Sequence, residues 1–201
     1  NKYVGQFVDG NANGQGTQTY TNGTKYSGEF KNSKKDGFGT YTYGQGQKYV
    51  GRWRNDAYNG LGKLEYSNGD RYEGMFVAGK PNGQGIFYFS NGDIYTGDFR
   101  DGNLHGIGEY RYRHGDIYVG DYENGRKSGN GEYTFSSGSK YIGDYSNNEK
   151  EGFGIYTFNG GDKYEGKFVN GLFDGYGAYR YSDGTIEEGL WEKGEYLGSV
   201  K

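Results

Sequence analysis

The sequence of 201 residues contains no cysteine and only one proline, Pro81. The absence of cysteine excludes a disulfide framework and a thiolate metal site, and it favours a reducing compartment. No apolar run approaches the roughly 20 residues that a membrane-spanning helix needs. The fold must therefore be held together by packing and hydrogen bonds.

Branched aliphatic residues and phenylalanine are also scarce. Leu, Ile, Val and Phe together make up about 16% of the chain, a level typical of disordered proteins. Two properties argue against disorder. Aromatic residues form 19% of the chain and the net charge is only −3, whereas disordered chains have few aromatics and a high net charge.

The chain repeats itself with a period of 23 residues, without insertion or deletion. Such a period predicts a stack of small units that contact only their neighbours. We interpret residues 1–201 as one continuous array, and as a segment of a longer array or of a multidomain protein. Repeats begin at Tyr3, Tyr26, Tyr49, Tyr72, Tyr95, Tyr118, Tyr141 and Tyr164, and an altered ninth begins at Glu187.

Each repeat contains two predicted strands, described here by counting the leading tyrosine as position zero. In the repeat of Tyr72, Gly74 and Phe76 follow at positions two and four, and this alternation places all three on one face of a strand. A second alternation has glycine at position thirteen and aromatic residues at fifteen and seventeen. Pairs such as Asn91-Gly92 then suit a hairpin turn, whereas the connection at positions six to eleven is more variable.

These patterns predict an all-β fold. We expect an elongated, single-layer antiparallel meander of 23-residue β-hairpins, twisted into a rod or trough. We expect cross-strand partners whose positions sum to seventeen, so that a ring lies opposite a glycine and covers its backbone. The same pairs form with the next repeat if a loop of about five residues connects them.

The pattern Tyr-x-Gly-x-aromatic-x-x-Gly, followed by Gly-x-Gly, resembles the MORN family (membrane occupation and recognition nexus). Tyr72, Gly74, Phe76 and Gly79 match its first part, and Gly83 with the glycine two residues later matches its second part. The resemblance covers essentially the whole chain, with eight matching repeats and the altered ninth. It implies an elongated antiparallel sheet of hairpins.

The resemblance also implies a range of functions. Family members include cytoskeletal scaffolds, membrane-tethering junctophilins, and accessory segments of phosphatidylinositol-phosphate kinases and a lysine methyltransferase. We therefore expect a non-catalytic scaffold or protein-interaction module in the cytoplasm, at cytoskeletal or membrane-cortex structures. Two alternatives remain open: a membrane-tethering or phosphoinositide-binding module, and a regulatory extension of a lipid kinase or methyltransferase.

Residues that could carry chemistry are few. His105 and His114 lie in different predicted connections without a cysteine nearby, and we interpret them as solvated loop residues. Glycine pairs such as Gly37 and Gly39 precede no helix that could bind phosphate, and no nucleophile has a base beside it. We expect no enzymatic activity, no cofactor and no metal site. The acidic net charge argues against nucleic acid.

The aromatic face is the main candidate for binding. A single-layer sheet buries this face only by curling on itself, so we expect a partly open groove. Large aromatic side chains with polar tips are typical interface anchors, and we predict that an extended peptide or amphipathic helix lies on them. The predicted groove residues are Tyr49, Trp53, Tyr66, Tyr72, Phe76, Phe89, Tyr95, Phe99 and Tyr112.

Two smaller surfaces complete the predictions. The altered ninth repeat is predicted to mediate self-association into a homodimer through Leu190, Trp191 and Leu197, because atypical terminal repeats act as caps or contact surfaces. A basic cluster is predicted to make weak contact with anionic phospholipid. Its residues are Lys25, Lys31, Lys34, Lys35, Lys48, Arg52 and Arg54.

Overall fold

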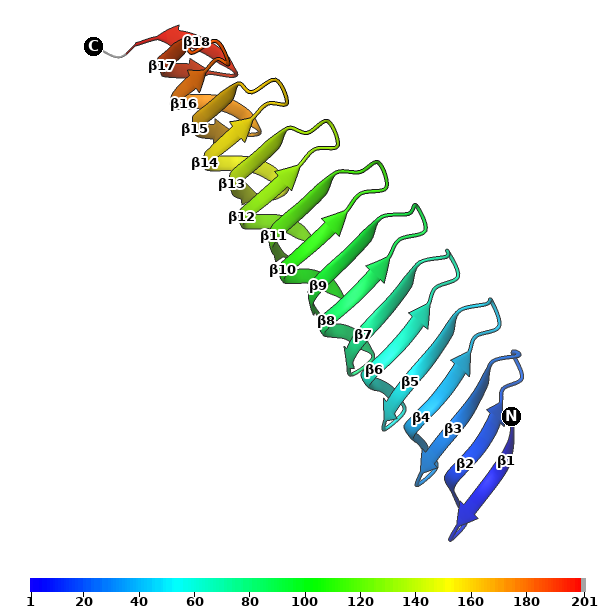
Figure 1. Cartoon of the computed structure of the whole chain (residues 1–201). Helices are drawn as coiled ribbons and strands as arrows, with labels where there is room; N and C mark the ends of the chain where they lie inside the picture. Colours follow the sequence, from blue (N-terminus) through cyan, green and yellow to red (C-terminus); the bar gives the residue numbers. More distant parts are fainter. Residues whose placement is uncertain (200–201) are drawn as a thin grey trace. The chain divides into compact units, whose positions relative to one another are not determined.

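The computed structural model describes residues 1–199 and confirms the all-β prediction, since β-strands joined by short turns make up this part of the chain (Figure 1). It divides into two compact units, Asn1–Asn103 and the part from Leu104 onward. Each unit is an antiparallel meander. Within residues 1–199, no helix is long and apolar enough to cross a membrane.

In the first unit, consecutive strands pair antiparallel. Its strands are β1 (Lys2–Val8), β2 (Asn11–Thr19), β3 (Lys25–Lys31), β4 (Lys34–Thr42), β5 (Lys48–Arg54), β6 (Ala57–Glu65), β7 (Arg71–Val77), β8 (Lys80–Tyr88) and β9 (Ile94–Arg100).

The second unit repeats this arrangement. Its strands are β10 (Asn103–Arg111), β11 (Ile117–Glu123), β12 (Arg126–Thr134), β13 (Lys140–Ser146), β14 (Glu149–Thr157), β15 (Lys163–Val169), β16 (Leu172–Arg180), β17 (Ile186–Glu192) and β18 (Glu195–Gly198).

The cross-strand register differs from the sequence expectation by two positions. Tyr26 faces Tyr41 and Gly28 faces Gly39, so glycine pairs with glycine and not with a ring. The same pairing joins neighbouring repeats, where Gly39 faces Gly51. Paired glycines leave an open space above the backbone, because neither strand contributes a side chain there.

A bulge in the second strand of each hairpin accompanies this register. In the hairpin of β3 and β4, Phe30 faces Lys35, whereas residues 36–38 lie opposite Glu29 alone. Gly37 within the bulge has a φ of 103°, a conformation that glycine adopts without strain. The bulge brings position nine, here Lys35, onto the same face as the ring at position four.

The turns also differ from expectation. Asn32 and Ser33 have φ values of 48° and 63°, as a two-residue type I′ turn requires, so the tight turn lies at positions six and seven. The Asn-Gly pairs lie instead in the connections between repeats, which have the expected length of five residues, such as residues 20–24 between β2 and β3. In the first repeat, the amide of Tyr20 donates to the carbonyl of Thr24 at 2.8 Å, and the amide of Gly23 donates to that of Tyr20 at 3.1 Å.

The core of each unit is built from aromatic rings. In the second unit, the fully buried Tyr141 meets Tyr145 edge to face with ring centres 5.3 Å apart. Tyr141 also meets Phe168 of the next repeat at 4.9 Å. Each such pair contributes about 0.5–1.5 kcal/mol beyond its buried area. The repetition of these contacts links neighbouring hairpins and replaces the missing aliphatic core.

Candidate functional site

The leading tyrosine of each repeat fills the space above a glycine pair. Tyr49 is fully buried, and its hydroxyl donates to the carbonyl of Arg52 at 2.8 Å. A Cβ atom added to Gly51 would lie 2.6 Å from the hydroxyl oxygen, and one added to Gly62 would lie 2.6 Å from Cε2. The ring therefore covers Gly51 of its own strand and Gly62 of the neighbouring strand, whereas the residue directly opposite Tyr49 is Leu64.

The structure separates the nine predicted groove residues into two sets. Six of them belong to the core, with at most 5% of their surface exposed, so the prediction that they contact a partner is corrected. These are Tyr49, Trp53, Tyr72, Phe76, Tyr95 and Phe99. The other three, Tyr66, Phe89 and Tyr112, are half-buried and remain predicted contacts.

These three rings belong to a series at position seventeen of the repeats, which we call the ring row. Phe135, for example, packs against Tyr133 with ring centres 4.5 Å apart and reaches Tyr156 of the next repeat at 5.7 Å. The ring row comprises Tyr20, Tyr43, Tyr66 and Phe89 in the first unit, and Tyr112, Phe135, Phe158 and Tyr181 in the second. All are half-buried except Tyr181, which is exposed.

Apart from Lys35, which was assigned to the basic cluster, sequence reasoning missed the residues at position nine, which the bulge turns toward the ring row. Tyr58 stacks on Tyr49, and Phe173 stacks on Tyr164, both with ring centres 3.7 Å apart. The sequence signal was the recurrence of a large or basic residue two positions after the tight turn. Three of these position-nine residues are lysines: Lys35, Lys127 and Lys150.

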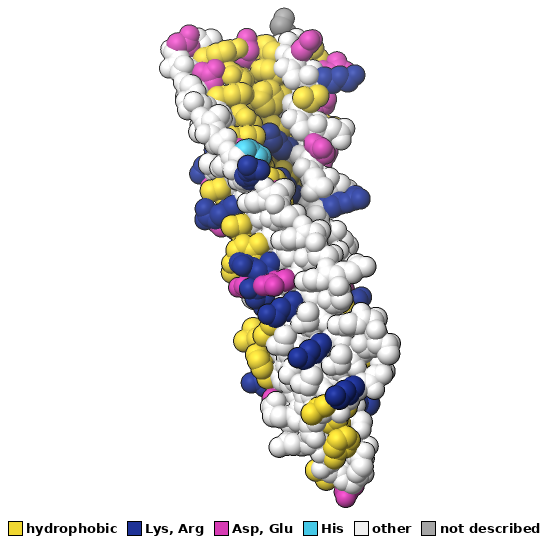
Figure 2. Space-filling view, turned by 90° about the vertical axis from the view of Figure 1, so that its right-hand side faces the viewer, with side chains coloured by type: hydrophobic (Ala, Val, Ile, Leu, Met, Phe, Trp, Pro, Cys, Tyr) yellow, Lys and Arg dark blue, Asp and Glu magenta, His cyan; other side chains and the backbone are white. Residues whose placement is uncertain are grey.

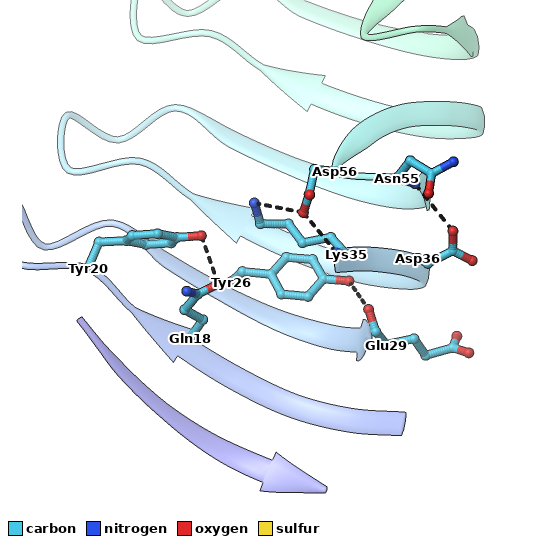
Figure 3. A network of polar contacts seen from close by, with 8 residues as sticks. All are labelled: Gln18, Tyr20, Tyr26, Glu29, Lys35, Asp36, Asn55 and Asp56. Carbon is cyan, nitrogen blue, oxygen red and sulfur yellow. Dashed lines mark hydrogen bonds and ion pairs between the residues drawn. The ribbon is translucent and has the colours of Figure 1, made fainter. Parts of the chain in front are cut away.

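Lys35 is paired within its own unit (Figure 3). Its Nζ lies 3.7 Å from Oδ1 of Asp56 and 5.1 Å from the ring centre of Tyr41. Figure 3 shows the same neighbourhood held by backbone contacts, with the Tyr26 hydroxyl donating to the carbonyl of Glu29 at 2.8 Å. The ammonium is stabilised by both a carboxylate and the faces of rings.

Lys127 and Lys150 are placed in the same way but lack the carboxylate. Lys127 Nζ lies 4.5 Å from the ring centre of Tyr133, and Lys150 Nζ lies 4.6 Å from that of Tyr156. Among the described residues, no carboxylate oxygen lies within 4.0 Å of either ammonium. Burial and then repulsion by Lys150 lower the pKa of Lys127 to about 8, and burial lowers the pKa of Lys150.

An apolar pocket lies next to Lys150. It has a volume of about 190 Å³ and is bordered by Phe158 of the ring row, Leu172 and Phe173. Figure 2 shows apolar side chains of the C-terminal hairpins gathered in a hollow of the surface. The second unit therefore offers an apolar recess, an ammonium group and exposed ring edges on one face.

The predicted basic cluster is divided by the structure. Four of its residues line a pocket of about 600 Å³ that also contains the carboxylate of Asp36: Lys31, Lys34, Arg52 and Arg54. Lys25 and Lys48 are exposed and do not line it. Lys35 points instead toward Tyr20 of the ring row, with Nζ 5.8 Å from the ring centre.

The altered ninth repeat presents only part of its predicted contact surface. Leu190 is 44% exposed and Leu197 is 61% exposed. Trp191 is only 6% exposed, and its Nε1 donates to the carbonyl of Gly177 at 3.2 Å. Trp191 is thus a core residue, and its predicted role in self-association is corrected. Tyr176, which faces Leu190 across the strands, is 51% exposed and was missed.

The face opposite the ring row carries a second set of apolar side chains that sequence reasoning did not single out. They occupy position twelve, and their exposed fractions lie between 56% and 66%: Phe38, Leu61, Ile107 and Phe153. In other repeats this position is polar, as with Gln84 and Asn130, so polar side chains interrupt the apolar set.

The two histidines are not equivalent. His105 is half-buried and lies in β10, not in a loop as expected, whereas the exposed His114 donates from Nε2 to Oδ2 of Asp116 at 3.1 Å. No group of three or more His, Asp or Glu side chains that could hold a metal ion occurs among the residues described.

Comparison with known families identifies the repeat. The family model described as MORN repeat matches eight consecutive segments of the chain: residues 3–25, 26–48, 49–71, 72–94, 95–117, 118–140, 141–163 and 164–186. These boundaries coincide with the repeats that begin at the leading tyrosines. A comparison with curated proteins finds no match.

Solved structures with a similar fold include domains of centriolar proteins. The wild-type TCP10 domain of Danio rerio CPAP is 14% identical and covers 96% of this chain and 89% of its own, with a TM-score of 0.52. The TCP domain of Drosophila melanogaster SAS-4, solved with a proline-rich motif of Ana2, is 14% identical over 88% of this chain and 90% of its own, with a TM-score of 0.48. At 14% identity the likeness to the Danio rerio domain is one of fold alone.

Proposed function

The chain belongs to the MORN-repeat family, and from this premise we propose that it is a scaffold that binds protein partners along the ring row. Family membership supports a non-catalytic, protein-binding role. The observation that carries the proposal is the ring row itself, because its aromatic side chains are half-buried and held by neighbouring rings. Such rings offer contact area at low entropic cost, since they are already fixed before a partner arrives.

The proposal places the scaffold in the cytoplasm, at cytoskeletal or membrane-cortex structures. The family's scaffold members motivate this location. The repeated surface supports it physically, because a regular series of equivalent sites suits a partner that is itself extended.

Selection from a displayed library of random peptides tests binding at the ring row. We expect the selected peptides to lose at least tenfold in affinity when Phe135 and Phe158 are both replaced by serine, because buried aromatic anchors are each worth about 2 kcal/mol or more. The matched control is Phe153→Ser, which removes an equally large ring from the opposite face. Peptides that respond equally to the two changes would refute binding at the ring row.

We also propose that the ninth repeat mediates a homodimer through Leu190 and Leu197. Their exposure, together with that of Tyr176, supplies a small apolar patch on the face opposite Trp191. Analytical ultracentrifugation of Leu190→Asp/Leu197→Asp should show a weaker dimer than the wild type, whereas Leu172→Asp should not. A wild-type chain that is monomeric at high concentration, and unchanged by removal of residues 187–201, would rule out this interface.

A second candidate function is contact with anionic phospholipid. It is favoured by the convergence of Lys31, Lys34, Arg52 and Arg54 on one pocket, since each basic residue near an anionic surface contributes about 1 kcal/mol. Co-sedimentation with phosphatidylserine vesicles should fall after Lys31→Glu/Lys34→Glu/Arg54→Glu. The control, Lys25→Glu/Lys48→Glu, changes charges that lie outside the pocket. An equal loss in the two variants would indicate a general charge effect and exclude a specific site.

A further inference from the structure

We propose that the second unit binds an acidic peptide in extended conformation, whose carboxylates meet Lys127 and Lys150 and whose next apolar side chain enters the pocket beside Phe173. This inference rests on the proposed function and specifies the partner of the ring row. It follows from three properties of this face: two ammonium groups without a carboxylate, their spacing by one repeat, and the position of the pocket.

The first property is an imbalance of charge. Lys35 has Asp56 within ion-pair distance, whereas Lys127 and Lys150 have no carboxylate within 4.0 Å among the described residues. Asp116, whose charge acts on Lys127, is already occupied, because its two oxygens accept from the Tyr133 hydroxyl at 2.6 Å and the Ser136 amide at 2.8 Å.

An unpaired ammonium in a half-buried site gains most from an incoming anion. The rings of Tyr118 and Tyr133 lie 4.9 Å and 4.5 Å from Lys127 Nζ and hold the amine away from bulk water. Charge-assisted hydrogen bonds formed in such a setting are stronger than those formed at an exposed surface. A carboxylate is therefore the group that this site recognises best.

The second property is the spacing of the two lysines. Lys127 lies on β12 and Lys150 on β14 at the same repeat position, so two strand spacings, or about 9.6 Å, separate them. A polyproline II chain advances about 3.1 Å per residue with three residues per turn, so side chains three apart lie on one side at about 9.3 Å. A peptide that crosses the strands in this conformation would present carboxylates three residues apart.

The third property is the location of the pocket one step further along. Phe173 occupies position nine in the repeat that follows Lys150. The pocket is bordered by Lys150, Phe158, Leu172 and Phe173 and has a volume of about 190 Å³. The recognised sequence is therefore acidic-x-x-acidic-x-x-apolar, with a backbone that tolerates proline at the intervening positions.

Binding should also take up protons near pH 8. The groups facing Lys127 are the tyrosines at 112, 118, 133 and 145, together with Lys150, Asp116 and Glu149. Burial and the charge on Lys150 lower the pKa of Lys127 to about 8, so part of the free protein carries a neutral amine at this pH. A bound carboxylate favours the ammonium form and raises this pKa, so affinity should fall as pH rises above 8.

The test uses the full chain and a fluorescent peptide with the sequence Glu-Pro-Pro-Glu-Pro-Pro-Leu. The two glutamates and the leucine are thus three residues apart, and proline fills the intervening positions. Fluorescence anisotropy should show binding that weakens about tenfold for Lys127→Met and for Lys150→Met. Methionine keeps the apolar stem and removes the charge. The matched control, Lys167→Met, removes an exposed lysine on the opposite face and should leave affinity unchanged.

Two further arms separate the possible failures. A peptide with glutamine in place of both glutamates should bind at least tenfold more weakly, and calorimetry in two buffers at pH 8 should detect proton uptake. Equal binding of the two peptides, or an equal effect of Lys167→Met, would overturn the inference. If the acidic peptide fails these tests but the display-selected peptides still depend on Phe135 and Phe158, binding along the ring row stands and only the preference for an acidic peptide is refuted. If the display-selected peptides do not depend on these two residues either, both proposals fail.

Discussion

The packing of the leading tyrosine over paired glycines makes Gly154→Ala the most informative change for the fold. A Cβ at this position would lie 2.5 Å from Cε2 and 2.7 Å from Cζ of Tyr141, closer than nonbonded carbons approach. Tyr141 is fully buried between Tyr145 and Phe168, so its ring has little room to move. The ring must shift and weaken its hydroxyl bond to the carbonyl of Asp144, now 2.9 Å long.

The expected cost combines these two effects. Overpacking a tight core costs about 1–3 kcal/mol, and a lost hydrogen bond adds about 1 kcal/mol. We therefore expect Gly154→Ala to lower the free energy of unfolding by about 2–4 kcal/mol. Urea denaturation followed by circular dichroism measures this change in the free energy of unfolding. Repeat arrays can depart from two-state behaviour, so the transition is compared among variants of the same chain.

Gly160→Ala provides the matched control. No heavy atom lies within 4 Å of a Cβ added at Gly160, so alanine there should be neutral or stabilise by up to about 1 kcal/mol. Gly154→Ala should also combine non-additively with Tyr141→Phe, because removal of the hydroxyl relieves part of the clash. If the free energies of unfolding of Gly154→Ala and Gly160→Ala differ by less than about 0.5 kcal/mol, glycine is not required for the tyrosine ring to pack against the backbone, and the reasoning is refuted.

Three further changes test other parts of the structure. Ala78→Asn should raise the free energy of unfolding by about 0.5–1 kcal/mol, because Ala78 has a φ of 48° and asparagine tolerates this conformation better than alanine. Thermal melting measures this change. Trp53→Phe removes the buried bond from Nε1 to the carbonyl of Gly39, 3.2 Å long, and should cost about 1–2 kcal/mol in urea denaturation. Burial opposes ionisation of Asp116, but hydrogen bonds from Tyr133 and Ser136 outweigh it and lower its pKa to about 2. The ionised Asp116 therefore contributes about 1 kcal/mol to the free energy of unfolding, a value reduced by solvent screening. This contribution is present above pH 4 and lost as pH falls toward 2. Asp116→Asn should flatten that part of the pH–stability profile.

The sequence predicts the repeat boundaries and strand positions because these depend on local alternation. The match of the MORN model to the segment beginning at Tyr3 and to each following segment confirms the period. Register was predicted incorrectly because it depends on the bulge at Gly37, where residues 36–38 face Glu29 alone. A bulge formed by a glycine at positive φ leaves no mark in the hydrophobic pattern that distinguishes it from a turn.

The candidate site was predicted less well for a related reason. Alternation places Tyr72 and Phe76 on one face but does not tell whether neighbouring rings cover them, and the structure shows both fully buried. The half-buried rings at position seventeen, such as Phe89, lie where the strand pattern ends, so they are less tightly enclosed. Lys127 and Lys150 were missed because they were assigned to a variable connection, whereas the bulge places them in strands on the ring face.

The identical register of successive repeats has a consequence for how such a gene can change. Tyr110 faces Tyr118, and one repeat later Tyr133 faces Tyr141. An in-frame deletion of residues 118–140 would therefore bring Tyr141 opposite Tyr110 and restore the same backbone pairing. Unequal recombination between repeats can thus alter their number while preserving the junctions. The number of ring-row side chains, which we propose as contacts for a partner, would change with the number of repeats.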